Sequence, residues 1–280
     1  MKKALLLKWV GGKTQLLDNI KERLPKEINN YYEIFLGGGS VLFMMLNMIK
    51  KGDIKLKGKV YAYDYNEPLI GVYKNIQNNH EELIKEVNKL KEEHNSNENK
   101  ENHYYEIREK YNKLKDKKTI ESTACFMFLN KTCFRGLYRE GPNGFNVPYG
   151  NYKNPAIIDE EYVKEISELI KDVVFECISY SESLKKPKKG DFVYMDPPYA
   201  PETKTSFVKY TEKGFTLENH EELFDMIKKL KKNVKFLLHN ADVSLVKDNF
   251  ADYTIDVIEA RRAINSRRPD AKTNEVIIVN

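Results

Sequence analysis

The stretch FVYMDPPY, residues 192–199, combines an apolar run with an abrupt stop. Its first four residues have the pattern of a buried strand, and neither proline after Asp196 can donate a backbone hydrogen bond. The strand must therefore end with the Asp196 carboxylate at its tip. Pro198 keeps Pro197 out of helical geometry, so the turn is stiff and presents a carboxylate, the Pro197 carbonyl and the Tyr199 ring. These groups can hold a flat ring that bears an amine; an ordinary surface turn is the alternative interpretation.

Six further runs have the extended, apolar pattern of strands and alternate with helical patterns. With residues 192–195 they make seven strands, which is typical of an α/β fold with a doubly wound, mostly parallel sheet. In such a sheet, ligands bind beyond the carboxyl ends of the strands. The six runs are residues 31–36, 59–63, 173–178, 234–239, 253–259 and 275–279.

A glycine-rich turn, GGGS at residues 37–40, directly follows the strand predicted at 31–36 and precedes a helical pattern over 41–49. Strand, glycines and helix in this order bring the polar groups of a ligand to free backbone N–H groups at a helix N-terminus. The turn departs from the dinucleotide fingerprint, because Leu42 stands where that fingerprint has its last glycine.

Asp64 ends the next predicted strand. An acid at this place holds the hydroxyls of a ribose in folds of this kind, so an adenosine-bearing ligand without a pyrophosphate fits both features. Asn66 and Pro68 then begin a helix by cap chemistry, and a plain helix cap is the alternative interpretation of Asp64. Gly37, Asp64 and Asp196 all fall at carboxyl ends of predicted strands, so three signals converge on one edge of the sheet.

The stretch KWVGGKT at residues 8–14 contains Gly-Lys-Thr, which suggests a triphosphate-binding loop. Such a loop needs a glycine five residues before Gly12, and that position is Leu7, so this interpretation is rejected. An isolated tryptophan such as Trp9 is more often part of a core than of a site.

The chain has 280 residues, of which 41% are apolar, and a formal net charge of +5. It can therefore bury a substantial core, and its mildly basic balance is compatible with a polyanionic partner. The basic excess lies in residues 131–153 and 261–272. Three cysteines without metal or redox spacing predict an intracellular protein with reduced thiols. No apolar run has the length needed to span a bilayer.

Residues 73–118 are strongly helical and highly charged, and we expect two solvated helices joined by a loop. A third helix, around residues 125–129, has the composition of a buried one. Residues 130–150 are then rich in glycine, aromatic and basic residues, with the turn signal Pro-Asn-Gly at 142–144. We expect a β-hairpin there. A projecting ribbon with arginines and aromatics can enter the major groove of DNA; the alternative is an ordinary surface hairpin.

In its motifs and their order the chain resembles the Dam-type DNA adenine-N6 methyltransferases of the D12 class. These enzymes have a Rossmann-like methyltransferase domain that binds S-adenosyl-L-methionine, and that domain is split around an inserted target-recognition domain. The resemblance implies a catalytic domain at residues 1–71 and 158–280 and a helical DNA-binding domain bearing the β-hairpin at 72–157. It covers nearly the whole chain and rests on residues 8–13, 35–39, Asp64, 130–139, 145–150, 196–199, Asn265-Ser266 and the terminal strand.

The resemblance implies a role for each residue that matches a family motif. The catalytic residues are Asp196, Pro197, Pro198 and Tyr199. The residues that bind S-adenosyl-L-methionine are Trp9, Lys13, Phe35, Gly37, Gly39, Ser40, Asp64 and Asp196. The residues that bind DNA are Lys131, Arg135, Tyr138, Arg139, Asn146 and Pro148.

The implied chemistry is mainly positioning. Asp196 and the Pro197 carbonyl accept the two N6 hydrogens of a flipped-out adenine, and Tyr199 stacks on its ring. A loop at residues 200–215, with Phe207 and Tyr210, is a candidate lid. Arg139 is the candidate guanine contact, while Arg135 and the arginines at 261–268 are candidate phosphate contacts. The recognition sequence stays open, because the hairpin tip is where family members vary.

The expected partner is double-stranded DNA, with no membrane and no metal, and the expected protein is a cytoplasmic monomer that can pair on DNA. Cytosine-N4 methylation uses the same geometry, but the aspartate rather than serine at position 196 disfavours it. Methylation of RNA or of a protein amide gives the hairpin segment no role. A catalytically silent DNA-binding regulator on the same scaffold is the alternative from a different class.

Overall fold

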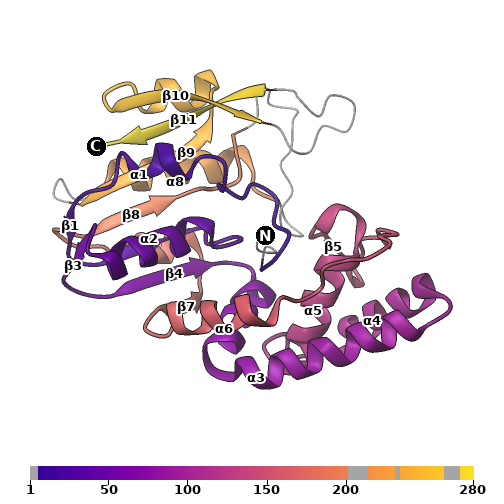
Figure 1. The fold of residues 1–280 in the computed structure, drawn as a ribbon. Coiled ribbons are helices and arrows are strands. Elements are labelled where there is room, and N and C mark those ends of the chain that lie inside the picture. Colours follow the sequence, from indigo (N-terminus) through magenta and orange to yellow (C-terminus); the bar gives the residue numbers. More distant parts are fainter. Residues whose placement is uncertain (1–5, 201–213, 231–233, 262–271) are drawn as a thin grey trace. The chain divides into compact units, whose positions relative to one another are not determined.

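The computed structural model describes residues 6–200, 214–230, 234–261 and 272–280 (Figure 1). The chain divides into two compact units, each made of several segments. The first, called the helical unit below, comprises Met1–Gly12, Gly37–Gly39 and Asp64–Cys177; the second, called the sheet unit, comprises Lys13–Leu36, Ser40–Tyr63 and Ile178–Asn280.

The sheet unit is built on strands in the order β10-β11-β9-β8-β2-β4 (Figure 1). Neighbouring strands from β9 to β4 are parallel, whereas β11 is antiparallel to both β9 and β10. The bounds are β2 Tyr31–Glu33, β4 Val60–Asp64, β8 Phe192–Met195, β9 Lys235–Ala241, β10 Thr254–Arg261 and β11 Lys272–Val279. The mostly parallel α/β fold expected from the sequence is confirmed, and each of the seven predicted strands is present, the seventh being β7 (Val174–Cys177) of the helical unit.

Helices of the sheet unit alternate with its strands. They are α1 Leu17–Lys21, α2 Ser40–Lys51, α7 Tyr180–Ser183, α8 Leu217–Lys228 and α9 Ser244–Asn249. A two-residue parallel pair, β1 (Glu27–Ile28) and β3 (Lys55–Leu56), adds a small second sheet.

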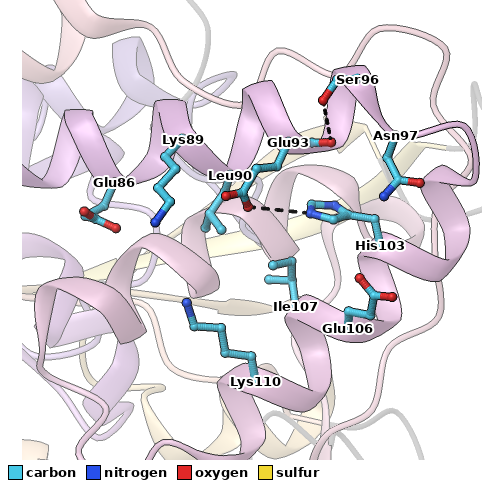
Figure 2. Close-up of a pocket in the computed structure, with 10 residues that line it drawn as sticks. All are labelled: Glu86, Lys89, Leu90, Glu93, Ser96, Asn97, His103, Glu106, Ile107 and Lys110. Carbon is cyan, nitrogen blue, oxygen red and sulfur yellow. Dashed lines mark hydrogen bonds and ion pairs between the residues drawn. The ribbon is translucent and has the colours of Figure 1, made fainter.

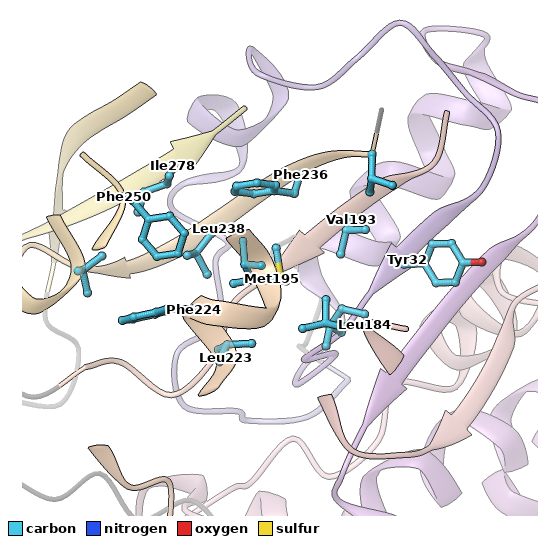
Figure 3. Close-up of a cluster of buried hydrophobic side chains, with 14 of the residues drawn as sticks. Tyr32, Leu184, Val193, Met195, Leu223, Phe224, Phe236, Leu238, Phe250 and Ile278 are labelled. Atoms are coloured by element: carbon cyan, nitrogen blue, oxygen red, sulfur yellow. The ribbon is translucent and has the colours of Figure 1, made fainter. Parts of the chain in front are cut away.

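The main core of the sheet unit lies between α8, α9 and one face of the sheet (Figure 3). Leu223 and Phe224 of α8 pack there against Val193 and Met195 of β8. Because residue side chains alternate between the faces of a strand, Tyr194 points to the opposite face, where it is also buried. Strands buried on both faces have continuous apolar runs rather than alternation, which is why 192–195 was readable as a core strand.

The helical unit contains three long helices: α3 Glu67–Ser96, α4 Lys100–Lys113 and α5 Ile120–Thr132. Asn66 caps α3 by accepting from the Leu69 N–H at 2.9 Å, as its sequence predicts. The charged stretch forms two helices with a short connection, as expected, although the apolar side of α3 is fully buried and its backbone is non-helical at Asn79. The predicted third helix is α5, and it is buried along nearly its whole length.

The predicted hairpin is also present, as β5 (Glu140–Gly141) paired antiparallel with β6 (Gly144–Phe145). A single turn, η1 (Phe134–Gly136), precedes it, and α6 (Glu160–Leu169) and β7 follow. Within the described residues, no helix is long and apolar enough to cross a membrane.

Candidate active site

Asp196 follows the last residue of β8 and forms an ion pair with Lys13, whose Nζ lies 2.6 Å from Asp196 Oδ2. The two side chains expose only 17% and 6% of their surfaces, so the pair is largely removed from water. Burial raises the pKa of Asp196 to about 6, the Lys13 cation acts against this rise, and the Glu275 carboxylate adds to it. Asp196 Oδ1 is buried and has no hydrogen-bond partner among the described residues. One oxygen of the carboxylate is thus anchored, and the other is left as an acceptor.

Tyr199 lies in the same unit, at the end of the Asp-Pro-Pro-Tyr turn. Its hydroxyl donates to Glu275 Oε2 at 2.5 Å, and Lys13 Nζ lies 5.0 Å from the centroid of its ring. Burial and the two carboxylates, Asp196 and Glu275, raise the pKa of the phenol, which therefore stays neutral. The backbone beyond the turn is fixed by a hydrogen bond from the Ala200 N–H to Asn240 Oδ1 at 2.9 Å.

Two other predicted cofactor residues belong to the sheet unit. Ser40 begins α2, and its hydroxyl accepts from the Lys13 backbone N–H at 3.1 Å. Phe35 packs in an aromatic cluster, with its ring centroid 6.1 Å from that of Tyr180 and 6.3 Å from that of Phe215. Lys13 is therefore held through its backbone as well as through its ammonium group.

The glycine turn and Asp64 lie together in the helical unit. Both oxygens of the Asp64 carboxylate accept backbone N–H groups, from Gly37 at 3.0 Å and from Asn66 at 2.9 Å. Burial raises the pKa of Asp64, and these backbone hydrogen bonds act in the opposite direction. The alternative interpretation of Asp64 as the helix cap is wrong, because Asn66 caps α3.

Trp9 packs on the glycine turn. A Cβ built on Gly37 would lie 3.1 Å from Trp9 Cδ1, and one built on Gly38 would lie 3.1 Å from Trp9 Cβ, so larger residues would crowd the indole. Gly37 also has a φ of +50°, which disfavours other residues. Trp9 also contacts Tyr138, whose ring stacks on the indole at a centroid distance of 5.8 Å. A predicted cofactor residue and a predicted DNA residue are thus in direct contact.

Arg139 and Asn146, both predicted to bind DNA, hold each other across the base of the hairpin. Arg139 Nε donates to Asn146 Oδ1 at 2.6 Å, and its Nη2 donates to the Asn146 carbonyl at 3.2 Å. Both side chains are exposed, as are those of Arg135 and Pro148. The guanidinium group is therefore oriented before any ligand binds.

Lys131 differs from the other predicted DNA residues, because only 4% of it is exposed. Burial and the nearby Lys8 lower the pKa of its ammonium group to about 8. Lys8 is tied to the end of α5 by three hydrogen bonds. Two join its backbone to the Asn130 side chain, from its N–H to Oδ1 at 2.8 Å and from Nδ2 to its carbonyl at 2.7 Å, and in the third its Nζ donates to the Lys131 carbonyl at 3.2 Å. The sequence did not indicate this link between residues 8 and 130.

A pocket of about 480 Å³ opens between α3 and α4 in the helical unit (Figure 2). Acids and bases line it, and His103 lies there with Nε2 3.8 Å from Glu93 Oε2. None of the residues predicted to act in catalysis, cofactor binding or DNA binding belongs to its lining. Among the residues that the structure describes, no group of three or more His, Cys, Asp or Glu side chains is placed to hold a metal ion.

Some predicted features lie outside the described residues: the lid with Phe207 and Tyr210, the arginines beyond Arg261, and Asn265-Ser266. Two residues of the site were missed by sequence reasoning, Glu275 and Asn240. Both sit within strands that read as ordinary core segments, and only the order of the strands brings them to Tyr199.

Comparison with known proteins identifies the family of the chain. Residues 9–264 match the model of the D12 class N6 adenine-specific DNA methyltransferases. The chain is 40% identical to the type II methyltransferase M.MjaIII of Methanocaldococcus jannaschii, over 98% of each chain. It is 34% identical to the type II methyltransferase M1.LlaDCHI of Lactococcus lactis subsp. cremoris, over 98% of this chain and 94% of the relative.

The chain is also 32% identical to the DNA adenine methylase of Escherichia coli K12, over 95% of this chain and 90% of the relative. The family match spans both units, and it includes the Asp-Pro-Pro-Tyr turn, the glycine turn and the hairpin. The chain belongs to the D12 class of N6 adenine-specific DNA methyltransferases.

Proposed function

We propose that this methyltransferase moves the methyl group of S-adenosyl-L-methionine to N6 of an adenine flipped out of duplex DNA. The observation that carries the proposal is the state of Asp196. Its Oδ2 is occupied by Lys13, and its Oδ1 is buried without a hydrogen-bond partner among the described residues. A buried acceptor without a partner is costly, and an N6 hydrogen of adenine would satisfy it.

The residues present fit S-adenosyl-L-methionine. Asp64 has both carboxylate oxygens fixed by backbone N–H groups, those of Gly37, Tyr65 and Asn66. A carboxylate has about four acceptor sites, so one is left for a ribose hydroxyl. The glycine turn leaves the backbone open to close approach, and Trp9 packs directly on it. The other residues proposed for the cofactor are Lys13, Phe35, Gly37, Gly39, Ser40 and Asp196. When bound, the cofactor supplies an activated methyl group on a sulfonium.

The protein's contribution is positioning. Adenine N6 is a poor nucleophile because its lone pair is delocalised into the ring. Asp196 Oδ1 and the Pro197 carbonyl are proposed to accept the two N6 hydrogens, which draws the nitrogen toward tetrahedral geometry, with Pro198 keeping the turn rigid. As the new N–C bond forms, the bond between the sulfonium sulfur and the methyl group would break and one N6 hydrogen would leave as a proton, which Asp196 Oδ1 is proposed to accept. Tyr199, neutral and anchored, presents its ring face for stacking.

Residues 72–157 are proposed as the target-recognition domain. Arg139, held by Asn146, has the planar fork that matches guanine in the major groove. Arg135 is proposed as a phosphate contact, and Tyr138 and Pro148 as neighbours of the DNA backbone or bases. Lys131, being buried, is proposed to support the loop that carries Arg135 rather than to contact DNA through its ammonium group.

The test is transfer of a labelled methyl group from S-adenosyl-L-methionine to duplex DNA, single-stranded DNA and RNA, followed by separation of the modified bases. We expect N6-methyladenine in duplex DNA from the wild type and none from Asp196→Ala. Label in N4-methylcytosine would show that the enzyme methylates cytosine instead of adenine. DNA binding without any label would favour the silent regulator. Sequencing DNA from expressing cells for N6-methyladenine then gives the recognition context.

A further inference from the structure

Tyr199 is held at two points by strands that lie far from it in the sequence. Its hydroxyl donates to Glu275 on β11, and the next residue donates its backbone N–H to Asn240 on β9. Val276 and Asn240 are register partners in the β11–β9 pair, so Glu275 lies one residue from the partner of Asn240. The backbone of the turn and the tip of the ring are therefore fixed by separate side chains.

The reversed direction of β11 brings Glu275 to this place. Since β11 is antiparallel to β9, its first residues lie beside the last residues of β9, with Glu275 opposite Ala241. The parallel strands of the sheet also end at this edge, where β8 leads into Asp196. β11 thus enters the sheet at the edge where the catalytic turn begins.

The charges around the ring determine the direction of the hydrogen bond. Tyr199 stays a neutral phenol, because burial and the carboxylates of Asp196 and Glu275 raise its pKa. An ionised carboxylate can only accept, so the phenol must donate to Glu275. Lys13 Nζ, 5.0 Å from the ring centroid, forms an ion pair with Asp196.

We propose that Glu275 is a positioning residue for methyl transfer, which fixes the hydroxyl end, and so the position, of the Tyr199 ring on which the target adenine stacks. The proposal rests on the proposed function, in which Tyr199 faces the flipped base. Without Glu275 the turn keeps its backbone anchor at Asn240, but the ring loses the bond that holds its hydroxyl end in place. A displaced stacking surface tilts N6 away from the line of methyl transfer, and misplacement on this scale costs up to roughly 100-fold in rate.

The variants that test this are Glu275→Leu, Glu275→Gln and Tyr199→Phe, together with the double variant Tyr199→Phe/Glu275→Leu. We expect Glu275→Leu and Tyr199→Phe to lower kcat by about 10- to 100-fold at unchanged KM for the cofactor. Glu275→Gln keeps an acceptor oxygen and should recover most of that rate. The double variant should be no slower than either single variant, because both remove one and the same bond.

The pH profile separates this role from a merely structural one. Glu275 raises the pKa of Asp196, so both Glu275 variants should move the acid limb of kcat to lower pH, and Tyr199→Phe should not move it in that direction. The matched control is Glu221→Gln, which removes an exposed carboxylate from helix α8. It should change neither the rate nor the acid limb.

A crystal structure of Glu275→Leu provides a readout that needs no activity. A Tyr199 ring that has left its wild-type orientation supports the proposal, and an unmoved ring overturns it. Full activity in Glu275→Leu, or additive losses in the double variant, would overturn it as well. If Glu275→Leu does not fold, the structure of Tyr199→Phe, which lacks the same bond, decides the question: a displaced ring supports the proposal, and an unmoved ring overturns it. A wild type that labels no adenine counts against the proposed function, and the position of the ring still decides this proposal.

Discussion

Lys13 Nζ lies 2.6 Å from Asp196 Oδ2, and its backbone N–H is bound by the hydroxyl of Ser40 at 3.1 Å. The lysine from the Gly-Gly-Lys stretch therefore acts electrostatically on the Asp-Pro-Pro-Tyr turn. Removal of either partner from an ion pair with so little exposure strongly destabilises the folded protein, because the other charge is then left buried.

The activity should fall below about pH 6, where Asp196 becomes protonated. The protonated group can no longer pair with Lys13 through one oxygen and accept an N6 hydrogen through the other. In Lys13→Met the acid limb should move upward by about 1 to 3 pH units, since the cation that lowers the pKa of Asp196 is gone. The measurement is kcat for methyl transfer against pH. Lys21→Met, which removes an exposed lysine of α1, is the control and should leave the limb in place. An unmoved limb in Lys13→Met would assign the limb to another group.

Asp64→Asn should weaken binding of S-adenosyl-L-methionine by about 10- to 100-fold. The side-chain amide accepts through its oxygen only, so one of the two backbone N–H groups, of Gly37 or of Asn66, loses its acceptor. Isothermal titration with the cofactor measures this without any DNA. Asp53→Asn, at an exposed aspartate just after α2, should bind as the wild type does. Equal affinities for all three proteins would remove Asp64 from the cofactor site.

Arg139→Ala should relax the sequence preference by about 1 to 3 kcal/mol, as loss of one bidentate base contact does. Asn146→Ala should have a smaller effect in the same direction, because it frees the guanidinium group that Asn146 orients. Rates on the recognised duplex and on duplexes with one changed base pair measure the preference. Arg135→Ala is the comparison: a phosphate contact should weaken binding to every sequence and reduce its salt dependence. Uniform weakening in Arg139→Ala would make Arg139 a phosphate contact too.

Gly136→Ala should destabilise the protein more than Gly52→Ala does. Both glycines have positive φ, +65° and +81°, which costs another residue about 1 to 2 kcal/mol. A Cβ on Gly136 would in addition overlap Lys8 Cβ, whereas one on Gly52 would meet open space. Urea unfolding compares the two free energies. Equal losses would mean that the Lys8 segment moves aside at little cost.

His220→Leu should stabilise the protein, and more so in acid. His220 is fully buried on α8, and neither ring nitrogen has a hydrogen-bond partner among the described residues. Burial lowers its pKa to about 4. The unfolded chain, with an ordinary histidine pKa, therefore takes up a proton first as the pH falls from about 6.5 to 4, and roughly 2 to 4 kcal/mol of stability is lost over that window.

Free energies of unfolding at pH 7.5 and pH 5 test this, with a gain for His220→Leu of about 1 kcal/mol at the higher pH and a larger gain at the lower. His80→Leu is the control. His80 Nδ1 has a partner in Ser167 Oγ at 3.0 Å, so its replacement should lower stability at pH 7.5. A His220→Leu variant with the same pH dependence as the wild type would place the acid sensitivity elsewhere.

The sequence was sufficient for the elements of the fold and for the strand ends that carry Gly37, Asp64 and Asp196. Continuous apolar runs such as 192–195 mark strands buried on both faces, and Asn66 with Pro68 marks a helix start by local chemistry. The direction of β11 was not predicted, because alternation of side chains gives the same pattern whichever way a strand runs. Glu275 was missed for the same reason, since its place beside Tyr199 follows from that direction.

Pairings between distant segments were also beyond the sequence. Lys13 was assigned to the cofactor by resemblance, and its ion pair with Asp196 depends on how the first helix and β8 pack. The burial of Lys131 was likewise not visible, since a lysine in a basic segment gives no sign of which way it points. Local patterns specify local structure, while contacts across the sheet depend on the order of its strands.

The inserted strand β11 also bears on how the protein is made. β9 and β10 precede it in the chain, and in the sheet each is its direct neighbour. While residues 272–279 are still inside the ribosome, β9 has an unpaired edge and β10 has no place in the sheet. Unpaired edges attract other chains, so the edge of β9 is open to aggregation throughout this interval. Arrival of β11 pairs that edge and delivers Glu275 to Tyr199 in the same step, so the sheet and the Asp-Pro-Pro-Tyr turn reach their final form together.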